Sequence, residues 1–264
     1  MTFAATLVGI GILGLVQRDF APICQPVPEG FPAREVLALV CALVAAATGA
    51  GLFWRRTAAL AARVLLVWLL LWMLAFRGRV IWLAPTAAVS WEGWGETAVL
   101  VAGTWTLYAV LATGWHQRRF GFAVGERGLL IARTVYGLAL IAFGAAHLAY
   151  VKETASLVPA WLPAHAAWVR FTGWTYIAGG VAVVAGVCAR LAATLAAVQI
   201  GLFTLLVWGP AVAAGSADAS QWSEAVISWA LTAGAWLVAA SYRDASWLAF
   251  PGERRGSAQG SLRK

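Results

Sequence analysis

The sequence predicts an all-α integral membrane protein with eight transmembrane helices in two tandem four-helix units. Composition is the first reason: of 264 residues, 62% are hydrophobic and only 11% are charged. Soluble domains contain about 25% charged residues, so this chain cannot cover a water-facing surface. The second reason is a series of long apolar segments, and the third is an internal similarity between the two halves.

Each apolar segment approaches the length of about 20 residues that a helix needs to cross a bilayer. The first is short, and the sixth and seventh are separated only by residues 188–190. The predicted spans are 3–17, 35–54, 57–76, 95–115, 131–151, 168–187, 189–209 and 223–242.

The charges between the spans predict the topology. With the N-terminus inside, the inner segments contain 13 of the 19 basic residues but only three of the 11 acidic ones. The positive-inside rule then places both termini in the cytoplasm. The basic residues form no amphipathic stripe and no recognised binding module, so the net charge of +8 does not indicate nucleic-acid binding.

The two halves align without a gap at an offset of 131 residues. The most informative matches are Pro28 with Pro159, Pro32 with Pro163, Trp91 with Trp222, and Gly103 with Gly234. Each unit has an even number of spans, so both share one orientation, and we expect a pseudo-two-fold axis along the membrane normal. The predicted divisions are a first unit at 1–116, a cytoplasmic linker at 117–130, a second unit at 131–243, and a basic, disordered cytoplasmic tail at 244–264.

His147 lies near the outer end of the fifth predicted span. An ionisable side chain inside a membrane indicates a functional site. The residue could ligate haem, hydrogen-bond a quinone or relay a proton, or it could make an interhelical hydrogen bond that only orders the bundle. Tyr150, one helical turn away, and Trp161, in the loop VPAWLP, are the neighbours that we expect to complete a site.

Arg77 and Arg79 end the third predicted span, and Glu92 and Glu96 open the fourth. Because a charge at the bilayer centre costs about 2.5–3.5 kcal/mol, these groups should lie near the outer interface. They could orient a polar head such as a quinone ring, or form an ion-pair network that joins the two spans. A composite site that uses His147 together with these charges is a further possibility.

Other motifs point to packing. Gly9, Gly11 and Gly14 spell GxGxxG, but no strand precedes them, and small residues in a membrane helix favour close helix packing. Cys24, Cys41 and Cys188 have no CxxC spacing, so no metal site is expected. The chain contains no HExxH, P-loop or GxSxG motif, and therefore no complete catalytic set.

The stretch RTVYGLALIAFGAAHLAYVKETASLVPAWLPAHAAWVRFTGWTYIAGG resembles the DoxX-like membrane protein family. The resemblance covers residues 131–242, and extends weakly over 3–115 through the repeat. Of the residues above, His147, Pro159, Trp161 and Pro163 fit the family's pattern. The first half departs from it, because it lacks the histidine and contains the Arg/Glu cluster instead.

That resemblance implies a multi-pass protein of the bacterial cytoplasmic membrane, linked to redox or quinone chemistry. One hypothesis is a non-catalytic membrane subunit or scaffold that docks a partner oxidoreductase. A second is a redox-active protein, a quinone-linked oxidoreductase if an enzyme, that binds quinone or haem near His147. A third is a transporter of small molecules or lipids, although no interrupted helix pair marks a substrate site.

Overall fold

The computed structural model describes residues 1–20, 27–215 and 217–250. Over these residues the secondary structure is helical and includes no strand, which confirms the all-α class. Cys24 and the part of the predicted tail from residue 251 onward lie outside the described residues.

The described chain folds into a series of helices, two of which are short π-helical segments. Along the chain they are α1 (Thr2–Gln17), α2 (Arg34–Gly51), α3 (Arg55–Trp72), the π-helical η2 (Met73–Arg77), α4 (Gly78–Leu83), α5 (Ala88–Leu111), α6 (Trp115–Arg119), α7 (Gly125–Ala149), α8 (Val151–Ala155), α9 (His165–Ala185), α10 (Ala189–Phe203), the π-helical η3 (Thr204–Trp208), α11 (Gly209–Ala213) and α12 (Ala219–Ala240).

Five helical segments are long and apolar enough to cross a membrane: Arg34–Gly51, Arg55–Leu83, Gly125–Ala149, Ala189–Ala213 and Ala219–Ala240. They confirm the predicted membrane environment. The other three predicted spans are also helices. However, α1 has only 16 residues, and α5 and α9 are of sufficient length but less apolar. Eight spans, and their grouping into two four-helix units, stay predictions.

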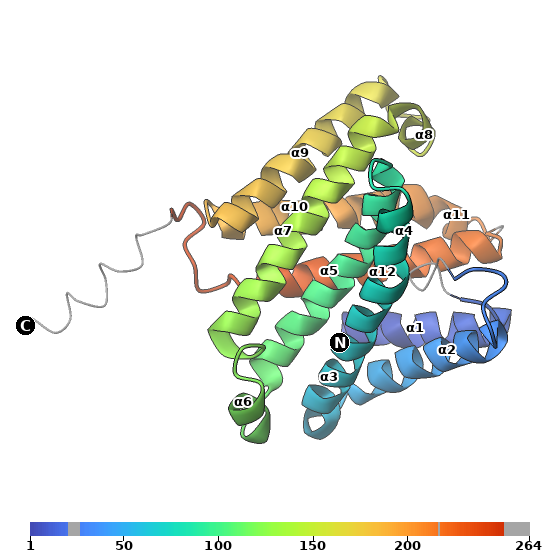
Figure 1. Cartoon of the computed structure of the whole chain (residues 1–264). Coiled ribbons are helices and arrows are strands. Elements are labelled where there is room, and N and C mark those ends of the chain that lie inside the picture. Colours follow the sequence, from blue (N-terminus) through green and yellow to red (C-terminus); the bar gives the residue numbers. More distant parts are fainter. Residues whose placement is uncertain (21–26, 216, 251–264) are drawn as a thin grey trace, which may run out of the picture.

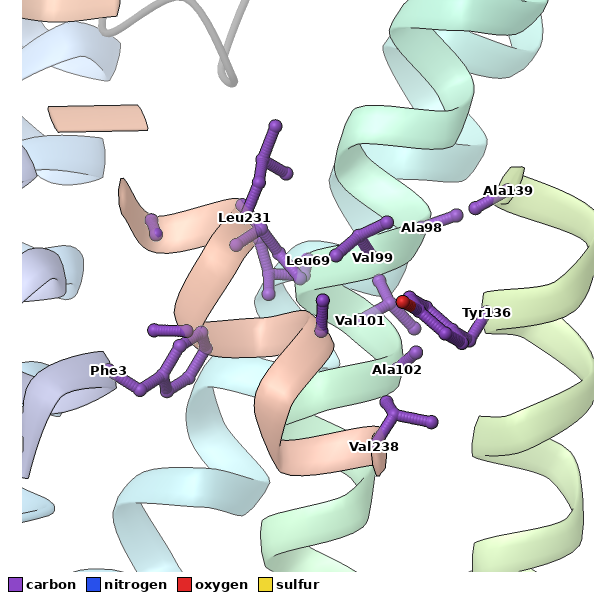
Figure 2. Close-up of a cluster of buried hydrophobic side chains, with 14 of the residues drawn as sticks. Phe3, Leu69, Ala98, Val99, Val101, Ala102, Tyr136, Ala139, Leu231 and Val238 are labelled. Carbon is purple, nitrogen blue, oxygen red and sulfur yellow. The ribbon is translucent and has the colours of Figure 1, made fainter. Parts of the chain in front are cut away.

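Helix α5 occupies the centre of the fold (Figure 1). It packs against α3, α7 and α12, and residues 97–104 are buried in succession, so every face of the helix is covered. Figure 2 shows Ala98, Val99, Val101 and Ala102 of α5 between Leu69 of α3, Tyr136 of α7 and the side chains of α12. A helix that is covered on all sides needs no polar face, which explains why α5 shows no amphipathic pattern.

Glycines allow the central helices to approach backbone to backbone. A Cβ atom added to Gly103 of α5 would lie 2.7 Å from the Cα of Gly234 in α12. Gly144 of α7 meets Gly173 of α9 in the same way. Such close approach gains dispersion energy, which is what joins helices when the surrounding lipid is as apolar as the side chains. Gly11 likewise packs against Ala42 and Ala46 of α2, in agreement with the packing interpretation of GxGxxG.

The two halves of the chain interlock. The pairing of α5 with α7 is the most extensive in the fold, and α12 packs against α1 far more than against α7. Several features also recur at the offset of the predicted repeat. Segments η2 and η3 begin 131 residues apart, and the left-handed residues Ala33 and Ala164 precede α2 and α9. Gly103 and Gly234, which are in contact, are themselves separated by 131 residues.

The crossing of α5 and α12 provides a test of this packing. Gly103→Ala would place a methyl group against the backbone of α12, so we expect a loss of about 1–3 kcal/mol in the free energy of unfolding. The loss should appear as a lower melting temperature of the detergent-purified protein. Gly209→Ala is the control, because no atom lies within 4 Å of its Cβ position. Equal stability of the two variants would contradict the close approach at Gly103.

Candidate functional site

A cavity of about 770 Å³ lies between α9 and α10. Its walls also include residues of α8, the loop 157–163, η3 and His147 of α7. Most lining side chains are apolar, and several of them, such as Phe171 and Leu195, are also exposed on the outer surface of the helices. The cavity is therefore a groove that opens sideways between two apolar helices. Its volume falls in the range of small-molecule sites.

His147 is held in a defined orientation at the wall of this cavity. Its Nδ1 lies 2.9 Å from the carbonyl oxygen of Phe143, one turn earlier in α7. Its ring also meets the ring of Tyr176 edge to face, at 5.4 Å between centroids. Because a carbonyl oxygen can only accept, Nδ1 must donate, and in the neutral imidazole Nε2 is then an acceptor. His147 thus offers the cavity wall a hydrogen-bond acceptor.

Gln199 of α10 connects the two helices that form the groove. The hydroxyl of Thr175 donates to the Gln199 amide oxygen at 2.7 Å, and the Gln199 amide nitrogen donates to the carbonyl oxygen of Thr172 at 3.1 Å. Tyr176 also interacts with the Gln199 side chain. These contacts agree with the expectation that a mid-span amide bridges helices. They also fix the polar atoms at the middle of the cavity.

The loop with the sequence VPAWLP covers one end of the cavity. The amide of Leu162 donates to the carbonyl oxygen of Pro159 at 2.9 Å and closes a turn, and Ala164 follows with a φ of 55° before α9 begins. Pro159, Trp161 and Leu162 line the cavity, although Trp161 remains 70% exposed. An exposed indole at a helix end suits the membrane interface.

The predicted Arg/Glu residues form a separate cluster at the junction of η2 and α5. Nη2 of Arg77 lies 3.5 Å from Oε2 of Glu96, and its Nε donates to the hydroxyl of Thr97 at 3.3 Å. The guanidinium packs on Gly93, where a side chain would exclude it. The Arg77 side chain is 11% exposed and that of Glu96 is 33% exposed, so the pair is only partly accessible.

Two further carboxylates belong to this cluster. Glu92 of α5 and Glu224 of α12 both lie close enough to Glu96 to repel its charge. Sequence reasoning missed Glu224 as a site residue, because it is far from Glu96 in the chain and no motif marks it. Arg79, by contrast, is exposed on α4.

The predicted site residues therefore fall into two groups. His147 and Trp161 line the cavity. Arg77, Glu92 and Glu96 form the cluster at the junction of η2 and α5. The cavity wall includes no residue of this cluster, and it includes neither Arg79 nor Tyr150. Tyr150 ends α7. Phe143 separates the groups: its ring packs on Gly95, next to Glu96, and meets the Tyr176 ring at 5.9 Å. A single composite site that uses both His147 and the Arg77–Glu96 cluster stays a hypothesis, and Phe143 would lie between its two parts.

Each group adjoins a π-helical segment. Arg77 ends η2, and Leu206 and Val207 of η3 line the cavity. Thr204 anchors η3 to α12 through a hydrogen bond of 2.9 Å to Thr232 and another of 3.2 Å to the carbonyl oxygen of Ser228. Single-turn π segments are frequent at functional sites, because they change the direction in which side chains point.

No cluster of three or more His, Cys, Asp or Glu that could hold a metal ion occurs among the described residues. His116 places Nδ1 3.2 Å from the hydroxyl of Tyr108. The short helix α6 folds back on α5 and brings the two rings together. His147 is therefore the one of the chain's three histidines that lines the cavity.

The Arg77–Glu96 pair can be tested by removing its cation. Arg77→Leu leaves a carboxylate that has lost its partner, and we expect a loss of stability. For a fully buried pair the loss is about 3–5 kcal/mol, and it should be smaller here because Glu96 is partly exposed. Arg79→Leu, two residues further along on an exposed position, is the matched control and should change the melting temperature little. If both variants melt alike, the pair contributes nothing to the fold.

No protein-family model, curated protein or solved structure matches this chain. The resemblance to DoxX-like membrane proteins accordingly stays an expectation from the sequence. The cavity beside His147 is the feature of the described residues that most resembles a small-molecule site.

Proposed function

We propose that this chain is a multi-pass membrane protein that binds a lipophilic carrier with a quinol-type head in the cavity beside His147. The single observation that carries the proposal is the oriented His147 ring, whose Nδ1 is engaged by Phe143 at the wall of an apolar cavity. A quinol hydroxyl donates a hydrogen bond, and Nε2 of this tautomer accepts one. The resemblance of residues 131–242 to DoxX-like proteins supports the same chemistry.

A neutral head suits this cavity better than haem does. Haem has two carboxylates that need cationic partners, and none of the described residues that line the cavity is Lys or Arg. The polar groups of the lining, among them the hydroxyls of Thr172, Thr175 and Tyr176 and the amide of Gln199, are all uncharged, which suits a neutral ring. A His whose second nitrogen donates to a carbonyl could also ligate a metal, so absorption spectroscopy is the appropriate control.

The cavity supports a binding role more than a complete catalytic one. Its lining has one imidazole and no carboxylate among the described residues, and Gln199 is already engaged by Thr175 and Thr172. We therefore infer a membrane subunit that holds the carrier while a partner oxidoreductase performs the electron transfer. The Arg77–Glu96 cluster is separated from the cavity by the ring of Phe143. Its position supports the view that the polar end of the site lies at this end of the bundle.

We further infer that both termini lie in the cytoplasm of a bacterium and that the chain contains two related units. Three of the four cation–π pairs of the described residues lie near the predicted inner ends, Arg63 on Trp115, Arg133 on Tyr242 and Arg190 on Trp247, and the fourth, Arg34 on Phe20, lies on the predicted outer side. Such pairs suit a membrane interface with a positive inner side. The paired positions of η2 and η3 support the duplication.

The binding proposal is tested with His147→Phe, which retains an aromatic ring against Tyr176 but removes the acceptor. Native mass spectrometry of the purified protein would measure binding of a benzoquinol and its quinone under anaerobic conditions. We expect the wild type to bind the quinol more tightly than the quinone. We expect His147→Phe to bind the quinol about tenfold more weakly than the wild type does, which corresponds to the loss of one hydrogen bond. His165→Phe, a histidine outside the cavity wall, should bind as the wild type does.

Two results would contradict the proposal. One is equal binding of the quinol by wild type and His147→Phe at unchanged melting temperature. The other is a Soret band in the wild-type absorption spectrum that is lost in His147→Phe, which would assign the histidine to haem instead.

A further inference from the structure

The cavity is much longer than a ring-sized head requires. Its lining extends along α9 from Trp168 to Ala182 and along α10 and η3 from Leu191 to Val207. At 1.5 Å per residue, the stretch of α9 alone corresponds to a groove of about 20 Å. Cys188, in the turn between α9 and α10, closes the end opposite Trp161. The groove thus follows the two helices over most of their length.

The two ends of this groove differ in polarity. The half that extends from the loop 157–163 to the middle of the groove contains, among apolar residues, the polar side chains His147, Thr154, Thr172, Thr175, Tyr176 and Gln199. The end near Cys188 is lined by Ala178, Gly179, Ala182, Leu191, Ala192, Leu195 and Ala196, all apolar. A polar half followed by an apolar half is complementary to a molecule with a hydrogen-bonding head and a hydrocarbon tail.

Small side chains keep the apolar half open. A Cβ added to Gly179 would have one neighbour within 4 Å, the carbonyl oxygen of Ala192 at 3.9 Å. Elsewhere on α9 the glycines are tightly packed, and a Cβ on Gly180 would lie 2.5 Å from the carbonyl oxygen of Gly137. The space at Gly179 therefore belongs to the groove and is not required for helix contact.

Aromatic side chains pack on one another at the corresponding positions of the first half of the chain. Gln199, Phe203, Val207 and Leu162 line the cavity, and the residues 131 positions earlier are Trp68, Trp72, Phe76 and Phe31. These four rings pack together, with centroid distances of 5.5 Å, 4.4 Å and 5.7 Å between successive pairs. An open groove is thus not an unavoidable result of this helix packing. An empty one would forfeit the contacts that its aromatic counterpart makes.

We infer that the groove between α9 and α10 binds a single hydrocarbon tail of about 20 Å, extended from a head at His147 toward Cys188. The ligand class is a prenyl-tailed or alkyl-tailed quinol that enters sideways from the membrane. The inference rests on the proposed function for the identity of the head. The position and length of the tail follow from the groove itself.

The test compares benzoquinols that share one head but have no tail, a geranyl tail or a geranylgeranyl tail. Binding to the full-length protein in nanodiscs is measured, with affinities expressed per mole fraction in the bilayer so that partitioning does not contribute. Because lipid is the reference state, the gain comes from packing contacts in the groove and not from leaving water, and we expect the affinity of the wild type to rise a few-fold with each lengthening. Gly179→Leu, whose side chain would fill the apolar half, should abolish that rise and leave the tailless quinol bound as before.

Gly209→Leu is the matched control, a helical glycine with nothing within 4 Å of its Cβ position and no place in the cavity wall. Ala182→Phe replaces Gly179→Leu if the latter does not fold, as judged by its melting temperature. Both variants should discriminate against long tails only, whereas His147→Phe should weaken all three quinols equally.

The outcomes separate the two proposals. Binding of the tailless quinol at His147 without any gain from a tail would overturn the tail groove and leave the proposed function intact. If Gly179→Leu and Ala182→Phe retain the full gain in affinity from a longer tail, the tail groove is likewise overturned and the proposed function stands. No quinol binding, together with a co-purified acyl lipid that Gly179→Leu excludes, would support the tail groove and overturn the proposed function.

Discussion

The burial of the central part of α5 is the constraint on which the rest of the structure depends. Residues 97–104 are covered on every side, by α3, α7 and α12. A helix in this position satisfies its backbone internally and must be narrow enough for three neighbours to approach. Gly103 meets Gly234 of α12, and Gly95 meets Phe143 of α7, so small residues set the distances at two of these three interfaces. The interlocking of the two halves follows from this placement.

The same burial controls where charge can be located. The ionisable groups of α5 lie in its first turns, and Glu96 is paired there with Arg77 at the end of η2. Arg77 is the last residue of η2, and its guanidinium packs on Gly93, where α5 has no side chain. A buried carboxylate without such a partner would be costly in an apolar medium, so the cation, the glycine and the π segment form one structural unit.

The two halves of the chain have different side chains at the positions that correspond to the walls of the cavity. In the first half, Trp68, Trp72 and Phe76 of α3 and η2 stack on one another. In the second half the walls are Gln199, Phe203 and Val207, and a cavity of about 770 Å³ remains. This groove, with oriented polar atoms toward one end, is where we propose that a ligand binds. His147, fixed by Phe143 and Tyr176, supplies the most specific of those atoms.

The sequence by itself determined the membrane environment, the all-α class and the approximate position of every long helix. Hydrophobicity over about 20 residues depends on local composition, which can be read directly from the chain. It also identified His147 and Arg77 as unusual, since an ionisable group in an apolar run is conspicuous wherever the helix is placed.

Only the tertiary structure decided which of these residues meet. The pairing of α5 with α7, the arrival of Glu224 beside Glu96 and the opening of the groove at Gly179 depend on how helices far apart in the chain cross. Small-residue contacts set those crossings, and Ala and Gly are too common in membrane helices for their pattern to reveal a partner. The separation of His147 from the Arg77 cluster by one ring, Phe143, is likewise a property of packing.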